Sequence, residues 1–203
     1  MKSPVTYAVP SLAVNKYMVI VKPSEQVQDR IKRIQNRWIE ENHLRPEQLQ
    51  AGYLLLSRFN MYAAQEDRLL RRLHYAAMEC APYRISLDGF FGLPDHSAGL
   101  KIANPTPVKH INQFIQHQLS GLKFPTERPY YNHYPAIGLA SRLEPNQYRD
   151  IWKKIEHRHF VAAFIADHFL VLRKAPQAKK WNLLGRFTYE NLPIQSKQGV
   201  LFA

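Results

Sequence analysis

The feature that most limits how this chain can fold is a pattern of elements that occurs twice. The motifs VKPSEQV (21–27) and ANPTPVK (103–109) each place a proline before a Ser or Thr suited to cap a helix, followed by an inward-facing valine. In both copies a strand precedes the motif, and a helix, a strand, a helix and a strand follow it. The interval from the proline to the second strand is almost the same in the two copies. A repeat of this size predicts two similar lobes related by a pseudo-twofold axis.

The expected elements follow from hydrophobic periodicity. Apolar residues at helical spacing predict four helices, at 23–44, 65–81, 106–119 and 144–157. Alternating or β-branched runs predict strands at 16–23, 51–59, 83–92, 98–105, 134–143 and 179–190, and a strand pair or one long strand at 159–174.

These elements predict a fold of the α+β class. We expect a single domain over 1–203, with approximate lobes at 16–92 and 98–190 and a C-terminal tail at 191–203. Antiparallel-rich sheets should form a central cleft, with the helices on the outside.

Composition adds a constraint on partners. The chain has 28 Lys and Arg against 16 Asp and Glu, a net charge of +12, which favours contact with polyanions and with nucleic acid first. No run of residues is long and apolar enough to span a bilayer, and the N-terminus lacks the pattern of a signal peptide. A single cysteine, Cys80, excludes an internal disulfide and is expected to be a small buried apolar residue. These features predict a cytoplasmic protein.

The repeat places AGYLLLSRF (51–59) and YPAIGLASRL (134–143) at equivalent positions, as the second strand of each lobe. Together with FIADHFLVLRK (164–174), they give the chain a resemblance to the 2′-5′ RNA ligase-like family of the two-histidine phosphoesterase superfamily. Members of that family carry His-x-Thr or His-x-Ser on each of the two strands. The resemblance implies a cleft in which two imidazoles act as general acid and base on a 2′,3′-cyclic phosphate or a 2′-5′ linkage, without a metal or another cofactor.

Both motifs are degenerate in this chain. Aligned with the family pattern, Ala136 and Gly138 take the histidine and threonine positions of the second motif, and Tyr53 and Leu55 take those of the first. None of the nine histidines is followed two residues later by Ser or Thr, so the motif is absent rather than displaced. A tyrosine, with an ordinary pKa of about 10, is a poor general base near neutral pH. We therefore expect most turnover by the family mechanism to be lost.

Five residues are candidates for holding a ligand at such a cleft. Arg58 and Arg142 follow the two equivalent strands, and Lys101 lies on the first strand of the second lobe, where each could pair with phosphate oxygens. His133 precedes the second motif and Tyr53 can donate a hydrogen bond.

An aromatic segment surrounds His133. Its tyrosines, Tyr130, Tyr131 and Tyr134, could stack nucleotide bases or could cover the edge of the core.

These observations lead to three hypotheses about function. The first is a 2′-5′ RNA ligase-like protein that has lost its acid–base histidines and binds RNA ends or nucleotides. The second is an active 2′,3′-cyclic phosphodiesterase that uses other residues, such as Tyr53 or His133. The third is a protein-interaction module that retains the fold alone.

The C-terminal sequence QGVLF raises a separate hypothesis. It resembles the short peptides that dock on bacterial sliding clamps through a glutamine, a leucine and a phenylalanine, here Gln198, Leu201 and Phe202. The alternative is an apolar tail that folds back on its own domain.

Overall fold

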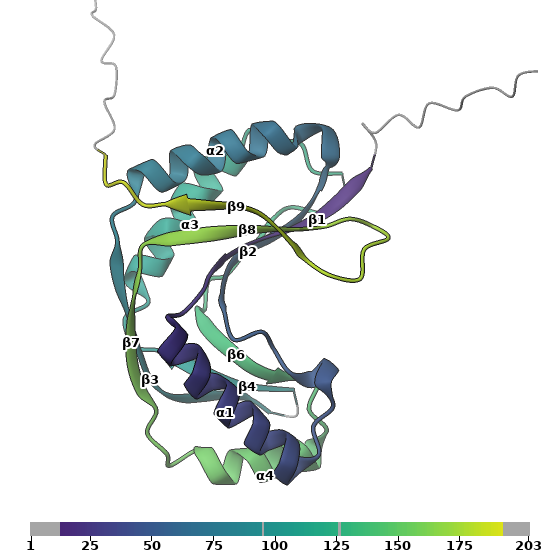
Figure 1. Ribbon diagram of the computed structural model, residues 1–203, viewed down its shortest axis with the longest axis vertical. Coiled ribbons are helices and arrows are strands. Elements are labelled where there is room, and N and C mark those ends of the chain that lie inside the picture. Colours follow the sequence, from purple (N-terminus) through teal and green to yellow (C-terminus); the bar gives the residue numbers. More distant parts are fainter. Residues whose placement is uncertain (1–12, 95, 126, 193–203) are drawn as a thin grey trace, which may run out of the picture.

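The computed structural model describes residues 13–192 apart from 95 and 126, and in this part of the chain nine strands form one antiparallel sheet (Figure 1). The sheet order is β7-β3-β4-β6-β2-β1-β8-β9, and the short β5 pairs with β2. The strands are β1 (Val14–Val21), β2 (Leu54–Tyr62), β3 (Tyr83–Leu93), β4 (Ser97–Ile102), β5 (Tyr130–Tyr131), β6 (Ala136–Ser141), β7 (Val161–Ala166), β8 (His168–Lys174) and β9 (Asn182–Thr188). The helices are α1 (Glu25–Asn42), α2 (Glu66–Glu79), α3 (Thr106–Leu119) and α4 (Pro145–Ile155), with short 3₁₀ turns η2 (Pro46–Gln48) and η3 (Ala63–Gln65). The predicted α+β class with an antiparallel-rich sheet is confirmed.

The sheet divides into two halves at its centre. Strands β2 and β6 are joined in register by one residue pair, Leu54 and Ile137, whereas the neighbouring ladders contain several pairs each. One half contains β2, β1, β8 and β9, and the other contains β6, β4, β3 and β7. Figure 1 shows the two halves curving away from each other on either side of β2 and β6.

The predicted repeat appears in the topology, but its two copies are interleaved. Counting outward from the centre, β2 and then β1 correspond to β6 and then β4. The last strand of the first copy, β3, pairs with β4 of the second, and the last strand of the second copy, β8, pairs with β1 of the first. Each half of the sheet is therefore built from both predicted lobes, 16–92 and 98–190.

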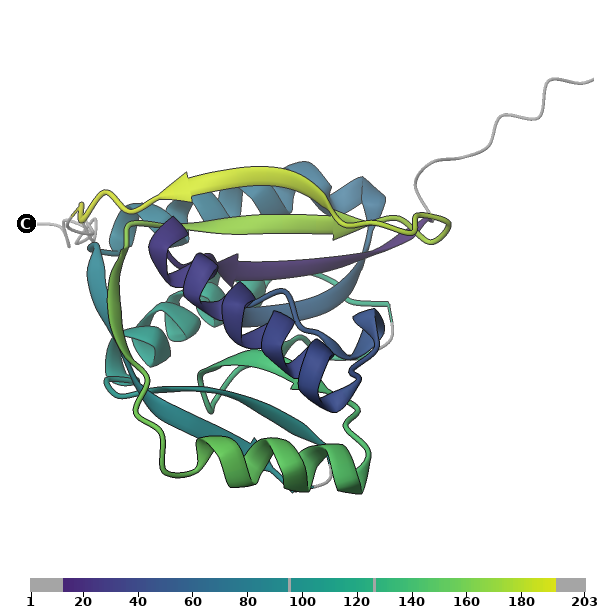
Figure 2. The ribbon, with the colours of Figure 1, turned by 60° about the horizontal axis from the view of Figure 1, so that its bottom comes forward.

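Each half of the sheet also packs against one helix from each copy of the repeat. Helices α1 and α4 pack against each other and against the half that contains β6, while α2 and α3 pack on the other half (Figure 2). The predicted apolar stripe of α1 is confirmed, since Val27, Ile31 and Trp38 are buried. In the described residues no helix is long and apolar enough to cross a membrane.

Some boundaries differ from the prediction for identifiable reasons. Strand β2 starts at Leu54 rather than at residue 51, because Gly52 adopts a left-handed backbone (φ 65°) just before it. The segment 159–174, predicted as a strand pair or one long strand, forms the pair β7 and β8 on either side of Asp167. Thr106 is the first residue of α3 rather than its cap, which is Pro105.

Two further expectations concern single side chains. Ser24 is the N-terminal cap residue of α1, although its side chain makes no capping hydrogen bond. Cys80 is buried and free, as predicted.

Candidate functional site

The centre of the sheet brings the two strands of interest together. Leu54 and Ile137 are antiparallel partners, and both side chains are fully buried. These two residues are also equivalent in the sequence repeat, so the pseudo-twofold axis passes between them. The same axis relates Tyr53 to Ala136, which precede the pair, and Leu55 to Gly138, which follow it. The repeat predicts the same two equivalences.

Side-chain alternation turns these neighbours toward the opposite face of the sheet from the Leu54–Ile137 pair. On that face lies a cleft with a volume of about 740 Å³. Leu55, Ala136 and Gly138 all line it, so three of the four motif positions border the cleft. The other lining residues are Gln50, Phe91, Leu93, Ser97, Lys101, Ile102, Pro105, Lys109, Tyr130, Asn132, His133, Tyr134 and Pro135.

The side chain of Gln50 covers the bare position at Gly138. A Cβ atom added to Gly138 would overlap the amide of Gln50, so any larger residue there would require that side chain to move. The Gln50 backbone is fixed, because its N–H donates to the Leu139 carbonyl at 3.0 Å and its carbonyl accepts from Gln35 Nε2 at 2.7 Å. Gln50 is itself exposed to solvent. A movable side-chain amide therefore occupies the place that the family pattern assigns to a hydroxyl.

Tyr53, the equivalent of Ala136 in the first copy, lies just before β2 and is turned away from the cleft. The Tyr53 hydroxyl donates to Met18 Sδ at 3.6 Å, and Tyr53 is not among the residues that line the cleft. Burial raises the pKa of the Tyr53 phenol above its ordinary value, and the nearby Arg58 offsets this only in part. A phenol with a raised pKa, turned toward a thioether, is poorly suited to accept a proton from a substrate.

The cleft is positively charged. Lys101 lies directly opposite Ala136 in the β4–β6 ladder and is exposed, and Lys109 reaches the cleft from α3. His133 also lines the cleft and is exposed. Among the described lining residues none is acidic. The two predicted candidates Lys101 and His133 therefore lie together, on a surface suited to an anion.

The aromatic segment beside the cleft is held in place by one buried asparagine. Asn132 donates from its backbone N–H to the Leu56 carbonyl and from Nδ2 to the Leu55 carbonyl, both at 2.9 Å. This anchoring leaves Tyr130 and Tyr134 at the surface, 49% and 91% exposed. Rigid backbone that presents exposed aromatic rings favours stacking of planar ligands.

The two predicted arginines lie elsewhere. Arg58 stands 5.8 Å from the centre of the Tyr130 ring and lines a separate groove that adjoins the cleft. Arg142 ends β6 in a left-handed backbone (φ 54°), with its carbonyl accepting a hydrogen bond from Gln48 Nε2 at 2.9 Å, and it is not among the cleft-lining residues. The tail residues Gln198, Leu201 and Phe202 lie outside the described part of the chain.

Comparison with solved structures identifies proteins of the same architecture. E. coli LigT in complex with 3′-AMP superposes with a TM-score of 0.59 at 12% identity, over 87% of this chain and 98% of LigT. The Thermus thermophilus protein TT0787 matches with a TM-score of 0.56 at 15% identity, over 86% of this chain and 98% of its own. The fold is that of LigT. No family model and no curated protein matches the sequence.

The LigT-like fold confirms the α+β architecture that the resemblance implied. The sequence pattern did not predict two other residues of the cleft, Gln50 and Lys109. Gln50 reaches Gly138 from the segment that follows η2, and no local pattern marks that contact. The helix that carries Lys109 was predicted, but helical spacing does not show that this lysine reaches the cleft. Among the described residues no cluster of three or more His, Cys, Asp or Glu side chains could hold a metal ion.

Proposed function

We propose that this protein binds nucleotides or RNA ends in the cleft and does not catalyse the family's acid–base reaction. The carrying observation is that the motif positions Leu55, Ala136 and Gly138 line an open cleft while none of them offers an imidazole or a hydroxyl. General acid–base groups each contribute about 10²–10⁴-fold to rate. A cleft that keeps its space and positive charge without these groups supports binding rather than turnover.

The solved neighbours add support for the ligand class. Structures of E. coli LigT contain 3′-AMP, NADP⁺, ATP and phosphate. Each of these ligands is, or carries, a phosphate, and all but one carry a nucleotide base. In this chain Lys101 and Lys109 are suited to the phosphate and Tyr134 is suited to the base. The expected cytoplasmic location remains a prediction.

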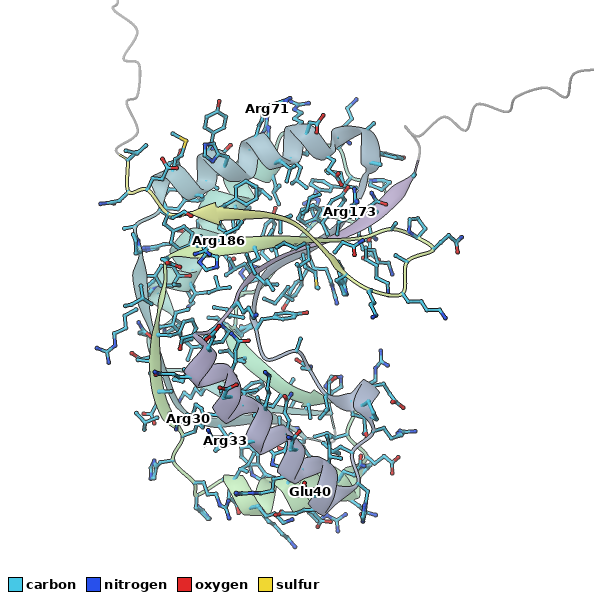
Figure 3. All side chains as sticks on the ribbon, in the orientation of Figure 1. Arg30, Arg33, Glu40, Arg71, Arg173 and Arg186 are labelled. Carbon is cyan, nitrogen blue, oxygen red and sulfur yellow. The ribbon has the colours of Figure 1, made fainter. Side chains whose placement is uncertain are left out.

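Calorimetric titration with AMP tests this proposal. Binding should be observed, and Lys101→Ala should weaken it about tenfold or more, because a charge-assisted contact to phosphate is lost. Arg71→Ala is the matched control, since Arg71 is exposed on the outer side of α2 (Figure 3).

A parallel assay with 2′,3′-cyclic AMP separates the competing functions. We expect no turnover by the unmodified protein. Turnover that His133→Ala abolishes would identify an active phosphodiesterase that uses a residue of the cleft. Neither binding nor turnover would leave the interaction module as the better hypothesis.

A further inference from the structure

A second groove adjoins the cleft and has a different character. Its volume is about 360 Å³, and it lies at the ends of β1, β2 and β8 that are far from α1. We call it the basic groove. It is lined by Lys16, Arg58, Phe59, Asn60, Glu127, Arg128, Tyr130, Lys174 and Trp181.

Two lysines of the basic groove are placed against each other. Lys16 of β1 and Lys174 of β8 are direct partners in the antiparallel ladder, and both side chains line the groove. Like charges directly opposite each other on a sheet are destabilising. The preceding residue on β8 shows the contrast, because Arg173 points to the other face and forms an ion pair with Glu66 at 2.9 Å.

The positive charge of the groove is not neutralised within the protein. In the described residues, Lys16, Arg58 and Lys174 take part in no ion pair. Glu127 is the one acidic residue among those that line the groove, against four basic residues. A concave surface that concentrates unpaired cations attracts an anion, and most strongly one with several charges.

The basic groove is continuous with the cleft through one aromatic residue. Tyr130 lines both, and it lies opposite Arg58 in the β2–β5 ladder. Trp181 adds a second partly exposed aromatic ring to the groove. Alternating cations and aromatic side chains along a connected surface are the pattern that binds single-stranded nucleic acid without sequence preference.

We propose that the basic groove binds the phosphates of a single-stranded RNA whose end lies in the cleft. The inference rests on the proposed function and specifies its substrate class as an oligonucleotide rather than a mononucleotide. The chain of the RNA passes across Tyr130, and Lys16, Arg58 and Lys174 contact its backbone. Trp181 stacks on one of its bases.

The experiment compares AMP with a labelled hexaadenylate RNA. The hexamer should bind the unmodified protein more tightly than AMP. Lys174→Glu should weaken binding of the hexamer about tenfold or more and leave AMP binding unchanged. The affinity for the hexamer should also depend less steeply on salt, because each lost phosphate contact reduces the slope of log K against log salt concentration by about 0.7. The melting temperature should hold or rise by up to about 4 °C, because the new carboxylate faces Lys16.

Matched variants distinguish the groove from a general effect of charge. Arg71→Glu makes the same change of charge on the outer side of α2 and should leave the hexamer affinity nearly unchanged. Trp181→Ala should weaken the hexamer about fivefold or more and spare AMP.

The experiment distinguishes a failure of the groove proposal from a failure of the proposed function. Equal losses with Lys174→Glu and Arg71→Glu, or a hexamer that binds no more tightly than AMP, would overturn the groove while leaving nucleotide binding in place. If AMP fails to bind but Lys174→Glu still weakens the hexamer, the cleft proposal fails and the groove stands. If neither probe binds, both fail.

Discussion

The two central strands hold equivalent positions in the repeat, and they lack the family motif in opposite ways. Just before β2, Tyr53 turns its hydroxyl to Met18 and away from the cleft. On β6 the position is reduced to Ala136 and Gly138, and the exposed side chain of Gln50 lies over the glycine. On the β2 side the first motif position is therefore turned away from the cleft and only Leu55 borders it, whereas both positions on β6 border the cleft.

Under the proposed function, this difference predicts where AMP binds. Side chains around Tyr53 and Met18 should contribute mainly to stability, and the side with Ala136, Gly138 and Lys101 should contribute mainly to affinity for AMP. Variants that remove atoms should therefore cost most stability on the β2 side, and variants that change AMP binding should lie on the β6 side, whereas variants of the basic groove should change binding of the hexamer alone. The predictions below test this division, in order of decreasing effect.

The largest expected effect is at Met18. It is 5% exposed beneath Tyr53, so Met18→Ala should lower the free energy of unfolding by about 2–5 kcal/mol in urea titrations. Gln50→Ala on the open side should cost less than about 0.5 kcal/mol. A Gln50→Ala variant as unstable as Met18→Ala would show that the β6 side is also part of the core.

The next effect compares two glycines that face each other across β4 and β6. A Cβ on Gly99 would meet the backbone carbonyl of Ile137 and the ring of Phe91, so Gly99→Ala should cost about 1–3 kcal/mol. Gly138→Ala should cost less, because the exposed Gln50 side chain can rotate away. Thermal and urea unfolding measure both. Equal costs would mean that Gln50 is held as firmly as backbone.

Tyr131, on the β2 side, should contribute to a pH dependence of stability. Burial raises the pKa of Tyr131, which pairs with β2, to about 12, while a tyrosine in the denatured chain ionises near 10. Between these values the denatured state has fewer bound protons than the folded state, so stability falls as pH rises through that window. Urea midpoints at pH 8 and pH 11 measure the loss. Tyr131→Phe should make the loss smaller, and an unchanged loss would assign it to other buried groups.

The smallest effect is expected at Tyr53. Tyr53→Phe removes one weak hydrogen bond to sulfur, so stability should change by less than about 0.5 kcal/mol. Affinity for AMP should stay within twofold, as measured by calorimetry. A tenfold loss of affinity would place the Tyr53 hydroxyl in the cleft and contradict the division between the two halves.

Local pattern was enough to predict part of this structure. The repeat predicted the order of elements and the equivalence that the Leu54–Ile137 pair displays, because caps and hydrophobic periodicity are properties of short segments. It did not predict which half each strand joins, since β3 and β8 choose partners from the other copy.

Part of the candidate site could also be predicted from the sequence. Lys101 and His133 line the same cleft as Ala136 and Gly138, and their role in binding stays a prediction. Gln50 over Gly138 and the opposition of Lys16 and Lys174 are contacts between residues far apart in the chain, which spacing alone does not reveal.

The pairing of β1 with β8 also affects how the chain reaches its folded state. Strand β1 leaves the ribosome long before β8, so one of its two neighbours is missing for most of synthesis. Strand pairings of such long sequence separation are slow to form, because loop closure precedes the gain from contacts. Until β8 emerges, one edge of β1 has no partner, so the half of the sheet that contains β1 and β2 cannot be completed until late in translation, whereas all four strands of the other half have been synthesised before β8.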